Sequence, residues 1–124
     1  MGDRLAYSVL LVDDSLVIRQ SLRGMFESVG CVCLESENGQ DAVVEGPRFK
    51  PDLIALDYSM PVMNGLEAAS LLRKVLPHTP IIMFTMFANS VFATQALAAG
   101  VTAVVSKAEA IHLLPKAESL LKPI

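Results

Sequence analysis

Residues 7–15 read YSVLLVDDS, and this stretch joins two kinds of pattern. Residues 7–12 are almost continuously apolar and partly β-branched, which is typical of a strand buried on both faces of a parallel sheet. Ser15 is a suitable helix N-cap, and the apolar residues beyond it recur at helical spacing as far as Gly30, which suits a helix end. The chain therefore starts with a buried strand that leads into a helix.

The same alternation of a short apolar run and a helical pattern repeats along the rest of the chain. The further predicted strands are residues 31–35, 52–56, 80–84 and 101–105. The further predicted helices are residues 40–45, ended by Gly46-Pro47; residues 66–76, closed by Pro77; residues 92–99, ended by Gly100; and a last helix that reaches about Leu121 with Pro115 in its first turn. Five strand–helix units with right-handed crossovers predict an open α/β sheet covered on both faces.

The composition fits one globular domain, and we expect residues 1–124 to form it. Hydrophobic residues make up 52% of the chain and charged residues 19%, which suits a packed core. The net charge of −3 predicts no attraction to nucleic acid or to an anionic membrane. Cys31 and Cys33 are expected to be reduced, apolar side chains, because no further metal ligands lie near them. No signal peptide or membrane-spanning run is recognisable, so we expect a cytoplasmic protein.

Polar residues follow four of the five predicted strands. They are Asp13 and Asp14 after the first strand, Asp57 after the third, Thr85 after the fourth, and Ser106 and Lys107 after the fifth. The carboxyl ends of parallel strands meet at one edge of a sheet, so we expect these side chains to share one crevice. Three close carboxylates repel one another, and Mg²⁺ relieves that repulsion because it prefers a few carboxylates, a carbonyl and water. The sequence therefore predicts a magnesium site.

The predicted site contains the groups that phosphoryl transfer needs, namely an aligned nucleophile and cations near the phosphoryl oxygens. Asp57 is the predicted nucleophile and would form an aspartyl phosphate. Lys107 is predicted to pair with one phosphoryl oxygen and Thr85 to donate its hydroxyl to another. Singly, such residues are more often helix caps or solvated charges, but their joint occurrence at strand ends favours a site. The predicted metal ligands are Asp14, Asp13 directly or through water, Asp57, and the backbone carbonyl of Ser59.

Several motifs resemble the receiver domain of two-component response regulators. They are LVDDS at 11–15, IALDYSMPVMNGLE at 54–67, FT at 84–85, AAGV at 98–101 and SK at 106–107. The resemblance covers nearly the whole chain and implies a flavodoxin-like (βα)5 three-layer sandwich with strand order 2-1-3-4-5. It also implies Mg²⁺-dependent phosphorylation of Asp57 by a histidine kinase or phosphotransfer protein, with no catalysis beyond self-assisted phosphorylation and autodephosphorylation. Phosphorylation would then alter the face made by the fourth helix, fifth strand and fifth helix.

The resemblance leaves the output open. The fourth strand and helix look most like those of receivers attached to helix-turn-helix output domains, and the family also includes chemotaxis receivers. No helix-turn-helix pattern follows Leu121, so we expect no direct nucleic acid binding by this chain and no membrane contact. A stand-alone receiver, the receiver part of a transcriptional regulator, a partner protein as the output and a homodimer all stay compatible with the sequence.

Three departures from the family pattern concern the output side of the site. Val104 stands where the family usually has Tyr or Phe, and a valine has little rotameric freedom to report a movement. Phe87 either substitutes for that aromatic residue or is simply a bulky loop residue, and the second interpretation is preferred.

Ala108 replaces the usual proline after Lys107. We therefore expect a trans bond and an altered loop, since a cis non-proline bond costs ~3–4 kcal/mol. Ser59 and Phe87 occupy positions that tune water access in the family, so Phe87 is expected to slow autodephosphorylation.

Two other functions fit parts of the pattern. A Mg²⁺-dependent phosphatase with an aspartyl-phosphate intermediate would resemble haloacid dehalogenases, but those enzymes carry Asp-x-Asp after their first strand, where this chain has Asp-Asp-Ser. A receiver-like domain that binds partners constitutively is favoured by Val104. The intact set of Asp57, Thr85 and Lys107 argues against it.

Overall fold

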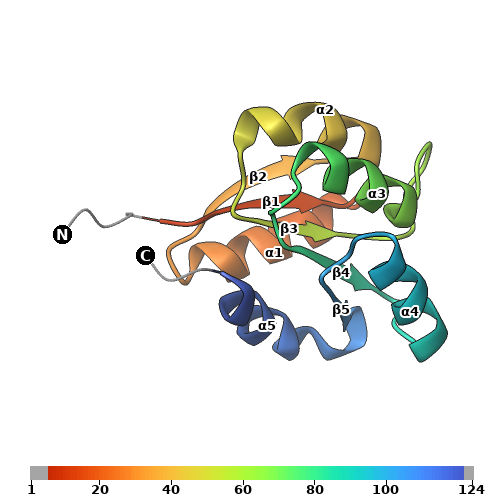
Figure 1. The fold of residues 1–124 in the computed structure, drawn as a ribbon. Coiled ribbons are helices and arrows are strands. Elements are labelled where there is room, and N and C mark those ends of the chain that lie inside the picture. The colour runs from red at the N-terminus through yellow and green to blue at the C-terminus, as the bar shows by residue number, and fades with distance from the viewer. Residues whose placement is uncertain (1–5, 122–124) are drawn as a thin grey trace.

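The structure, a computed structural model, describes residues 6–121 and shows a parallel sheet between two layers of helices (Figure 1). In chain order the elements are β1 (Ser8–Val12), α1 (Leu16–Glu27), β2 (Val32–Ser36), α2 (Gly39–Phe49), β3 (Leu53–Leu56), α3 (Gly65–Val75), β4 (Ile81–Thr85), α4 (Ser90–Ala98), β5 (Ala103–Ser106), the 3₁₀ segment η1 (Lys107–His112) and α5 (Leu113–Leu120). The strand order is β2-β1-β3-β4-β5, which confirms the predicted flavodoxin-like fold. The predicted domain limits, residues 1 and 124, lie outside the described residues.

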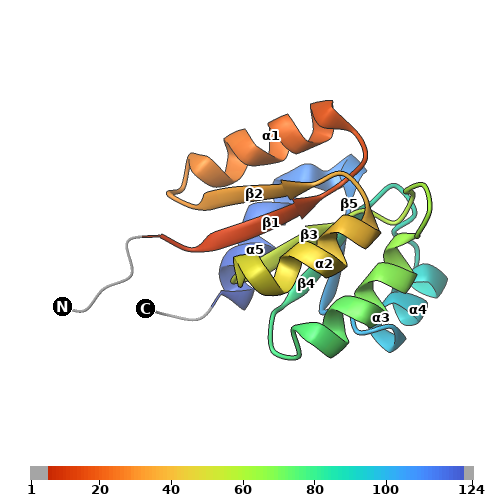
Figure 2. The ribbon, with the colours of Figure 1, turned by 90° about the horizontal axis from the view of Figure 1, so that it is seen from above.

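The two faces of the sheet are covered by different helices. Alternate residues of β1 point to opposite sides: Val9 and Leu11 pack with the buried residues of α1 and α5, whereas Leu10 and Val12 pack with those of α2, α3 and α4. In both views α2 and α3 lie side by side over the sheet (Figure 1 and Figure 2). Burial on both faces explains why the central strands are apolar without interruption. Among residues 6–121, no helix is long and apolar enough to cross a bilayer.

The register of the central strands places two aspartates next to each other. Val12, the last residue of β1, pairs with Ser36 of β2 on one side and with Leu56 of β3 on the other. Asp13 and Asp57 are each the next residue along their strands. The chain reverses its direction of winding between β1 and β3, and this switch point is where open α/β sheets form their ligand crevice.

Polar caps fix the start of the four helices that follow strands β1 to β4. The N-caps are Ser15, Asn38, Asn64 and Asn89, whose side chains accept hydrogen bonds from the backbone N–H groups of Ile18, Asp41, Glu67 and Phe92. At α3 the Glu67 side chain also accepts from the Asn64 N–H, which completes a capping box. Each cap ends the loop that leads from a strand to the next helix, so it also fixes the loops around the crevice.

The prediction that the second helix ends at Gly46-Pro47 is wrong. Helix α2 continues to Phe49, and Lys50 ends it in the left-handed conformation with φ of 49°. A Cβ added to Gly46 would lie 3.3 Å from a methyl carbon of Leu76, so this glycine lets α2 approach α3 closely. Packing against α3 outweighs the single hydrogen bond that Pro47 removes near the helix end.

The C-terminal third of the chain follows the prediction with small shifts. Strand β5 begins two residues later than predicted, and α5 carries Pro115 in its first turn, as expected. No peptide bond within residues 6–121 is cis, in agreement with the expected trans bond after Lys107. The Ala108 N–H donates to the Ser106 hydroxyl at 3.1 Å at the start of η1. Whether this loop is altered relative to the family stays a prediction.

The two cysteines are free and buried, as expected. Burial raises the pKa of the Cys33 thiol to about 11, so this thiol stays protonated at neutral pH.

Candidate functional site

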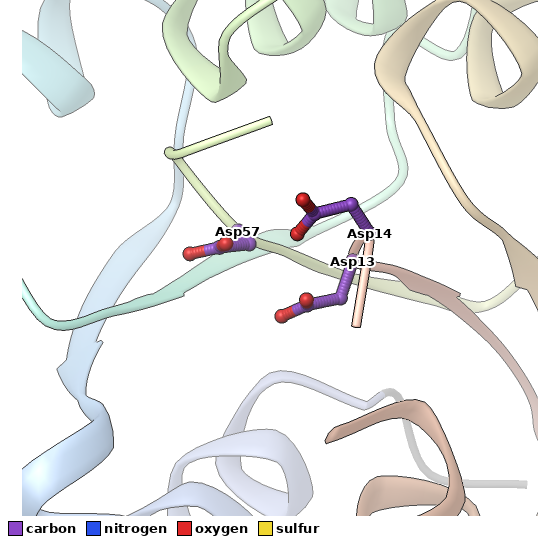
Figure 3. Close-up of side chains that lie close together, drawn as sticks. All are labelled: Asp13, Asp14 and Asp57. Carbon is purple, nitrogen blue, oxygen red and sulfur yellow. The ribbon is translucent and has the colours of Figure 1, made fainter. Parts of the chain in front are cut away.

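Three carboxylates converge beyond the ends of β1 and β3. One oxygen from each of Asp13, Asp14 and Asp57 lies within 4.8 Å of the others, and Figure 3 shows the three side chains close together. Asp13 and Asp57 are buried, with 2% and 6% of their surface exposed, whereas Asp14 is exposed. Backbone hydrogen bonds continue the sheet past its strands, because the Asp57 N–H donates to the Val12 carbonyl at 2.9 Å. The carboxylates are therefore held by the sheet itself.

Lys107 brings a cation to the two buried carboxylates. Its Nζ lies 2.9 Å from Asp13 Oδ2 and 3.4 Å from Asp57 Oδ1, and the lysine side chain is only 15% exposed. Lys107 directly follows β5, at the edge of the sheet, so it reaches this position across the ends of β4 and β3. A lysine that binds two buried carboxylates is restricted to a narrow range of positions.

Negative charge is in excess in this cluster. Burial raises the pKa of Asp57 above its ordinary value, and the neighbouring charge of Asp13 raises it further. Lys107 and the Tyr58 backbone N–H oppose that rise without cancelling it. A hard divalent cation fits these residues because carboxylate oxygens are its preferred ligands and it would offset the excess charge. The exposed position of Asp14 leaves the cluster open toward water.

Gly65 is a site-building residue that the sequence interpretation missed. Its N–H donates to the Tyr58 carbonyl at 2.8 Å, which closes the loop between β3 and α3. A Cβ at this position would overlap the carbonyl oxygen of Asp57 and lie 2.7 Å from the Tyr58 Cα. Only glycine permits this approach, so α3 can begin directly against the backbone of Asp57. Its place in the quoted motif after Asp57 was the only sequence signal.

The family model described as the response regulator receiver domain matches residues 9–118. The chain belongs to this family. Chemotaxis protein CheY of Thermotoga maritima is 34% identical to this receiver domain over 101 residues, which cover 81% of each chain. The protein-glutamate methylesterase/protein-glutamine glutaminase of Methanococcoides burtonii is 34% identical over 116 residues, which cover 90% of this chain and 33% of that protein. This receiver domain therefore spans about a third of the length of that relative.

Solved structures agree with this assignment. The response regulator domain of Thermotoga maritima CheB superimposes with a TM-score of 0.86 at 28% identity, covering 95% of this chain and 99% of that one. Vibrio cholerae chemotaxis protein CheY4 gives a TM-score of 0.87 at 28% identity, covering 94% and 99%. The receiver fold and its family are thus established by sequence and by structure.

The remaining predicted site residues of the receiver domain lie on β4, on β5 and in the loop after β3. Thr85, the last residue of β4, is completely buried, and its hydroxyl accepts a hydrogen bond from the Phe87 N–H at 3.3 Å. Ser59 is exposed in the loop two residues beyond Asp57, and its role as a carbonyl ligand stays a prediction. Val104 is partly buried and packs against the core on the α2–α3–α4 face.

An aromatic cluster that was not predicted lies beside the site. The rings of Tyr58 and Phe87 meet edge to face with centroids 5.7 Å apart, and those of Tyr58 and Phe92 with centroids 5.1 Å apart. Tyr58 directly follows Asp57, and Phe92 lies in the first turn of α4. Phe87 is half-exposed and its ring contacts Tyr58, and its role in the switch stays a prediction.

Proposed function

We propose that this receiver domain is a phosphorylation-dependent signalling switch in which Asp57 accepts a phosphoryl group in a Mg²⁺-dependent reaction. The donor is a histidine kinase or a phosphotransfer protein. The observation that carries the proposal is the convergence of Asp13, Asp14 and Asp57 at the strand ends, with Lys107 beside the buried pair. A cytoplasmic location follows from this role.

The proposed transfer uses Asp57 as the nucleophile, the neighbouring side chains of the site, Mg²⁺ and a phosphorylated donor. An oxygen of Asp57 forms a bond to phosphorus while the nitrogen–phosphorus bond of the donor phosphohistidine breaks, and the imidazole keeps the electron pair. Lys107 stabilises one phosphoryl oxygen from its position 3.4 Å from Asp57, and the Thr85 hydroxyl donates to another. Asp13, Asp14, Asp57 and the Ser59 carbonyl would hold Mg²⁺, which supplies positive charge opposite the carboxylates and the phosphoryl oxygens.

The aromatic cluster is the proposed route from the site to α4. The Phe87 N–H is bonded to the Thr85 hydroxyl, so a movement of that hydroxyl toward a phosphoryl group also moves the backbone of Phe87. The Phe87 ring contacts Tyr58, and Tyr58 contacts Phe92 at the start of α4. This route replaces the aromatic residue that position 104 lacks and alters the face made by α4, β5 and α5. Phe87 also shields the phosphoryl group from water, so Phe87→Ala is expected to shorten its lifetime.

The kind of output that the switch controls can be proposed from the relatives of this receiver domain. Relatives include a protein-glutamate methylesterase and the transcriptional regulatory protein LnrK of Bacillus subtilis, which is 28% identical over 111 residues covering 88% of this chain and half of that protein. Residues 1–124 are proposed to form one receiver domain that acts on a linked output domain, on a partner protein or through a homodimer. The chain itself is proposed not to bind nucleic acid or membranes.

Intact-mass measurement after incubation with Mg²⁺ and a small phosphodonor tests the proposed function. The wild type is expected to gain the mass of one phosphate, and Asp57→Asn to gain none. Sustained hydrolysis of many phosphomonoesters would instead support a phosphatase. A wild type that gains no phosphate would support a receiver-like domain that binds its partners constitutively.

A further inference from the structure

Two arginines of α1, one turn apart, share a single carboxylate of β2. Arg19 Nε lies 2.8 Å from one oxygen of Glu35, and Arg23 Nε lies 2.7 Å from the other. The Glu35 side chain is 24% exposed, so water only partly weakens these pairs. Burial acts to raise the pKa of Glu35, but its hydrogen bonds to Arg23 and Arg19 hold that pKa below the ordinary value. Glu35 is therefore an ionised bridge between the two guanidinium groups.

The two arginines differ in their second contact. Arg19 Nη1 donates to the backbone carbonyl of Asp13 at 2.7 Å, and its side chain is 11% exposed. Arg23 Nη1 instead donates to Glu27 on the helix surface at 3.1 Å, and its side chain is 37% exposed. Arg19 thus links Glu35 to the acidic cluster, whereas Arg23 links it to an exposed residue of the same helix.

The carbonyl that Arg19 binds belongs to the peptide joining Asp13 to Asp14. A peptide unit is planar, so holding its oxygen also sets the direction of the following N–H and Cα. The Asp13 carboxylate is already held by Lys107 at 2.9 Å and by the Ser15 N–H at 2.9 Å. Asp14 lies in the short loop between β1 and α1, so this peptide fixes the Cα from which the exposed Asp14 side chain extends.

We propose that Arg19, held in place by Glu35, is a positioning residue that aims the Asp14 carboxylate at the cation site. The inference rests on the proposed function, because it assumes that the cluster binds Mg²⁺. Arg19 touches neither Asp57 nor the reacting atoms, so its loss weakens cation binding without removing the phosphoryl acceptor. Partners that orient metal ligands typically cost 10–100-fold in affinity when they are removed.

Titration calorimetry with Mg²⁺ alone, without a phosphodonor, tests this inference. Arg19→Met is expected to weaken Mg²⁺ binding about tenfold. Arg23→Met is the matched control: it removes the other bond to Glu35, and its dissociation constant is expected to stay within about twofold of the wild type. Melting temperatures are measured in parallel. A merely structural role would lower the melting temperature of both variants and leave both affinities unchanged.

The rate of Asp57 phosphorylation provides a second readout. In Arg19→Met the rate is expected to need about tenfold more Mg²⁺ for half-saturation and to approach the wild-type rate at saturation. Arg19→Lys serves as the second variant if Arg19→Met does not fold, because one ammonium cannot reproduce the planar guanidinium that binds Glu35 and Asp13 together. Equal Mg²⁺ affinities of the wild type and both Arg19 variants would overturn this inference alone. A wild type that binds no Mg²⁺ would overturn the proposed function together with it.

Discussion

The acidic edge of the sheet consists of Asp13, Asp14, Asp57 and Lys107, and the α4 side consists of α4 and the loop before it, residues 86–98. The two regions adjoin, but one is charged and the other is apolar. At the acidic edge, ionised groups are held by backbone hydrogen bonds and by Lys107. In contrast, the stretch from the end of α3 to the end of β5, residues 75–106, which contains α4, has no Asp, Glu, Lys or Arg. Large apolar side chains are exposed there, among them Met86, Val91 and Leu97. In the proposed function, phosphoryl transfer would depend on charges held in fixed positions, whereas the response on α4 would involve apolar side chains, which can repack without separating ion pairs.

This difference predicts which changes each region tolerates. Displacing a group at the acidic edge alters the chemistry or the fold directly. A change on the α4 side is expected to leave the phosphorylation of Asp57 unchanged and to alter the size of the structural response in α4.

The largest expected effect is that of Gly65→Ala, which disturbs the packing of the acidic edge and lowers the stability of the fold. The added Cβ would overlap the Asp57 carbonyl oxygen, which belongs to the backbone and has little freedom to move. The free energy of unfolding is expected to fall by about 3 kcal/mol, as for an overpacked core. Urea unfolding measures it.

Gly24→Ala is the matched control, because a Cβ added to this glycine of α1 would meet nothing within 4 Å. It is expected to raise the free energy of unfolding by ~0.5–1 kcal/mol through helix propensity. If both variants proved equally stable, the close approach at Gly65 would not matter to the fold.

Lys107→Ala has the next largest effect and removes the cation that lies beside Asp13 and Asp57. Phosphorylation of Asp57 is expected to slow ~10²-fold, the usual loss when one electrostatic partner of a transition state is removed. Phosphate incorporation over time measures the rate. Lys116→Ala, at an exposed position of α5, is the control and is expected to react like the wild type. An unchanged rate in Lys107→Ala would contradict the assigned role.

Tyr58→Leu and Val104→Ala test which of the two side chains transmits phosphorylation of Asp57 to α4. Hydrogen–deuterium exchange of residues 86–98 is measured with and without phosphorylation, and intact mass establishes that Asp57 is phosphorylated in each variant. Tyr58→Leu is expected to reduce the phosphorylation-dependent change about fivefold, which corresponds to roughly 1 kcal/mol of coupling. Val104→Ala is expected to leave it unchanged. The reverse result would show that residue 104 carries the signal despite its small side chain.

Asp57→Asn without divalent cations is expected to have the smallest effect. Unlike most substitutions of a buried residue, it is expected to raise the free energy of unfolding. The pKa of Asp57 is raised in the folded state, so the folded protein binds more protons than the unfolded chain as the carboxyl titrates. Stability from this group therefore falls as the pH rises from the ordinary aspartate pKa of about 3.9 through the raised folded value. At pH 7 the variant is therefore expected to be more stable than the wild type.

Thermal unfolding at several pH values measures this difference. Mg²⁺ is expected to reduce it, because the cation stabilises the wild type more than a variant that lacks one carboxylate. If the stabilities of the two proteins depended on pH in the same way, the pKa of Asp57 would not be raised in the folded state.

Much of the acidic edge could be predicted from the sequence because the signals are local. Apolar runs predict buried strands, and polar residues immediately after them mark the edge where a parallel sheet binds ligands. Asp13, Asp57 and Lys107 were identified in this way, and the structure brings them within ion-pair distance. The end of α2 was placed wrongly at Gly46-Pro47, because a local helix-breaking signal was outweighed by packing against α3.

The sequence alone determined the order of the elements, the strand-end residues and the absence of an aromatic side chain at position 104. Only the tertiary structure decided which groups beyond the strand ends meet across elements. Tyr58 lies between Phe87 and Phe92, and Arg19 rather than Arg23 reaches the Asp13 carbonyl. The physical reason is that strand and helix patterns arise from neighbouring residues, whereas ring contacts and shared ion pairs depend on how separate elements are placed against one another.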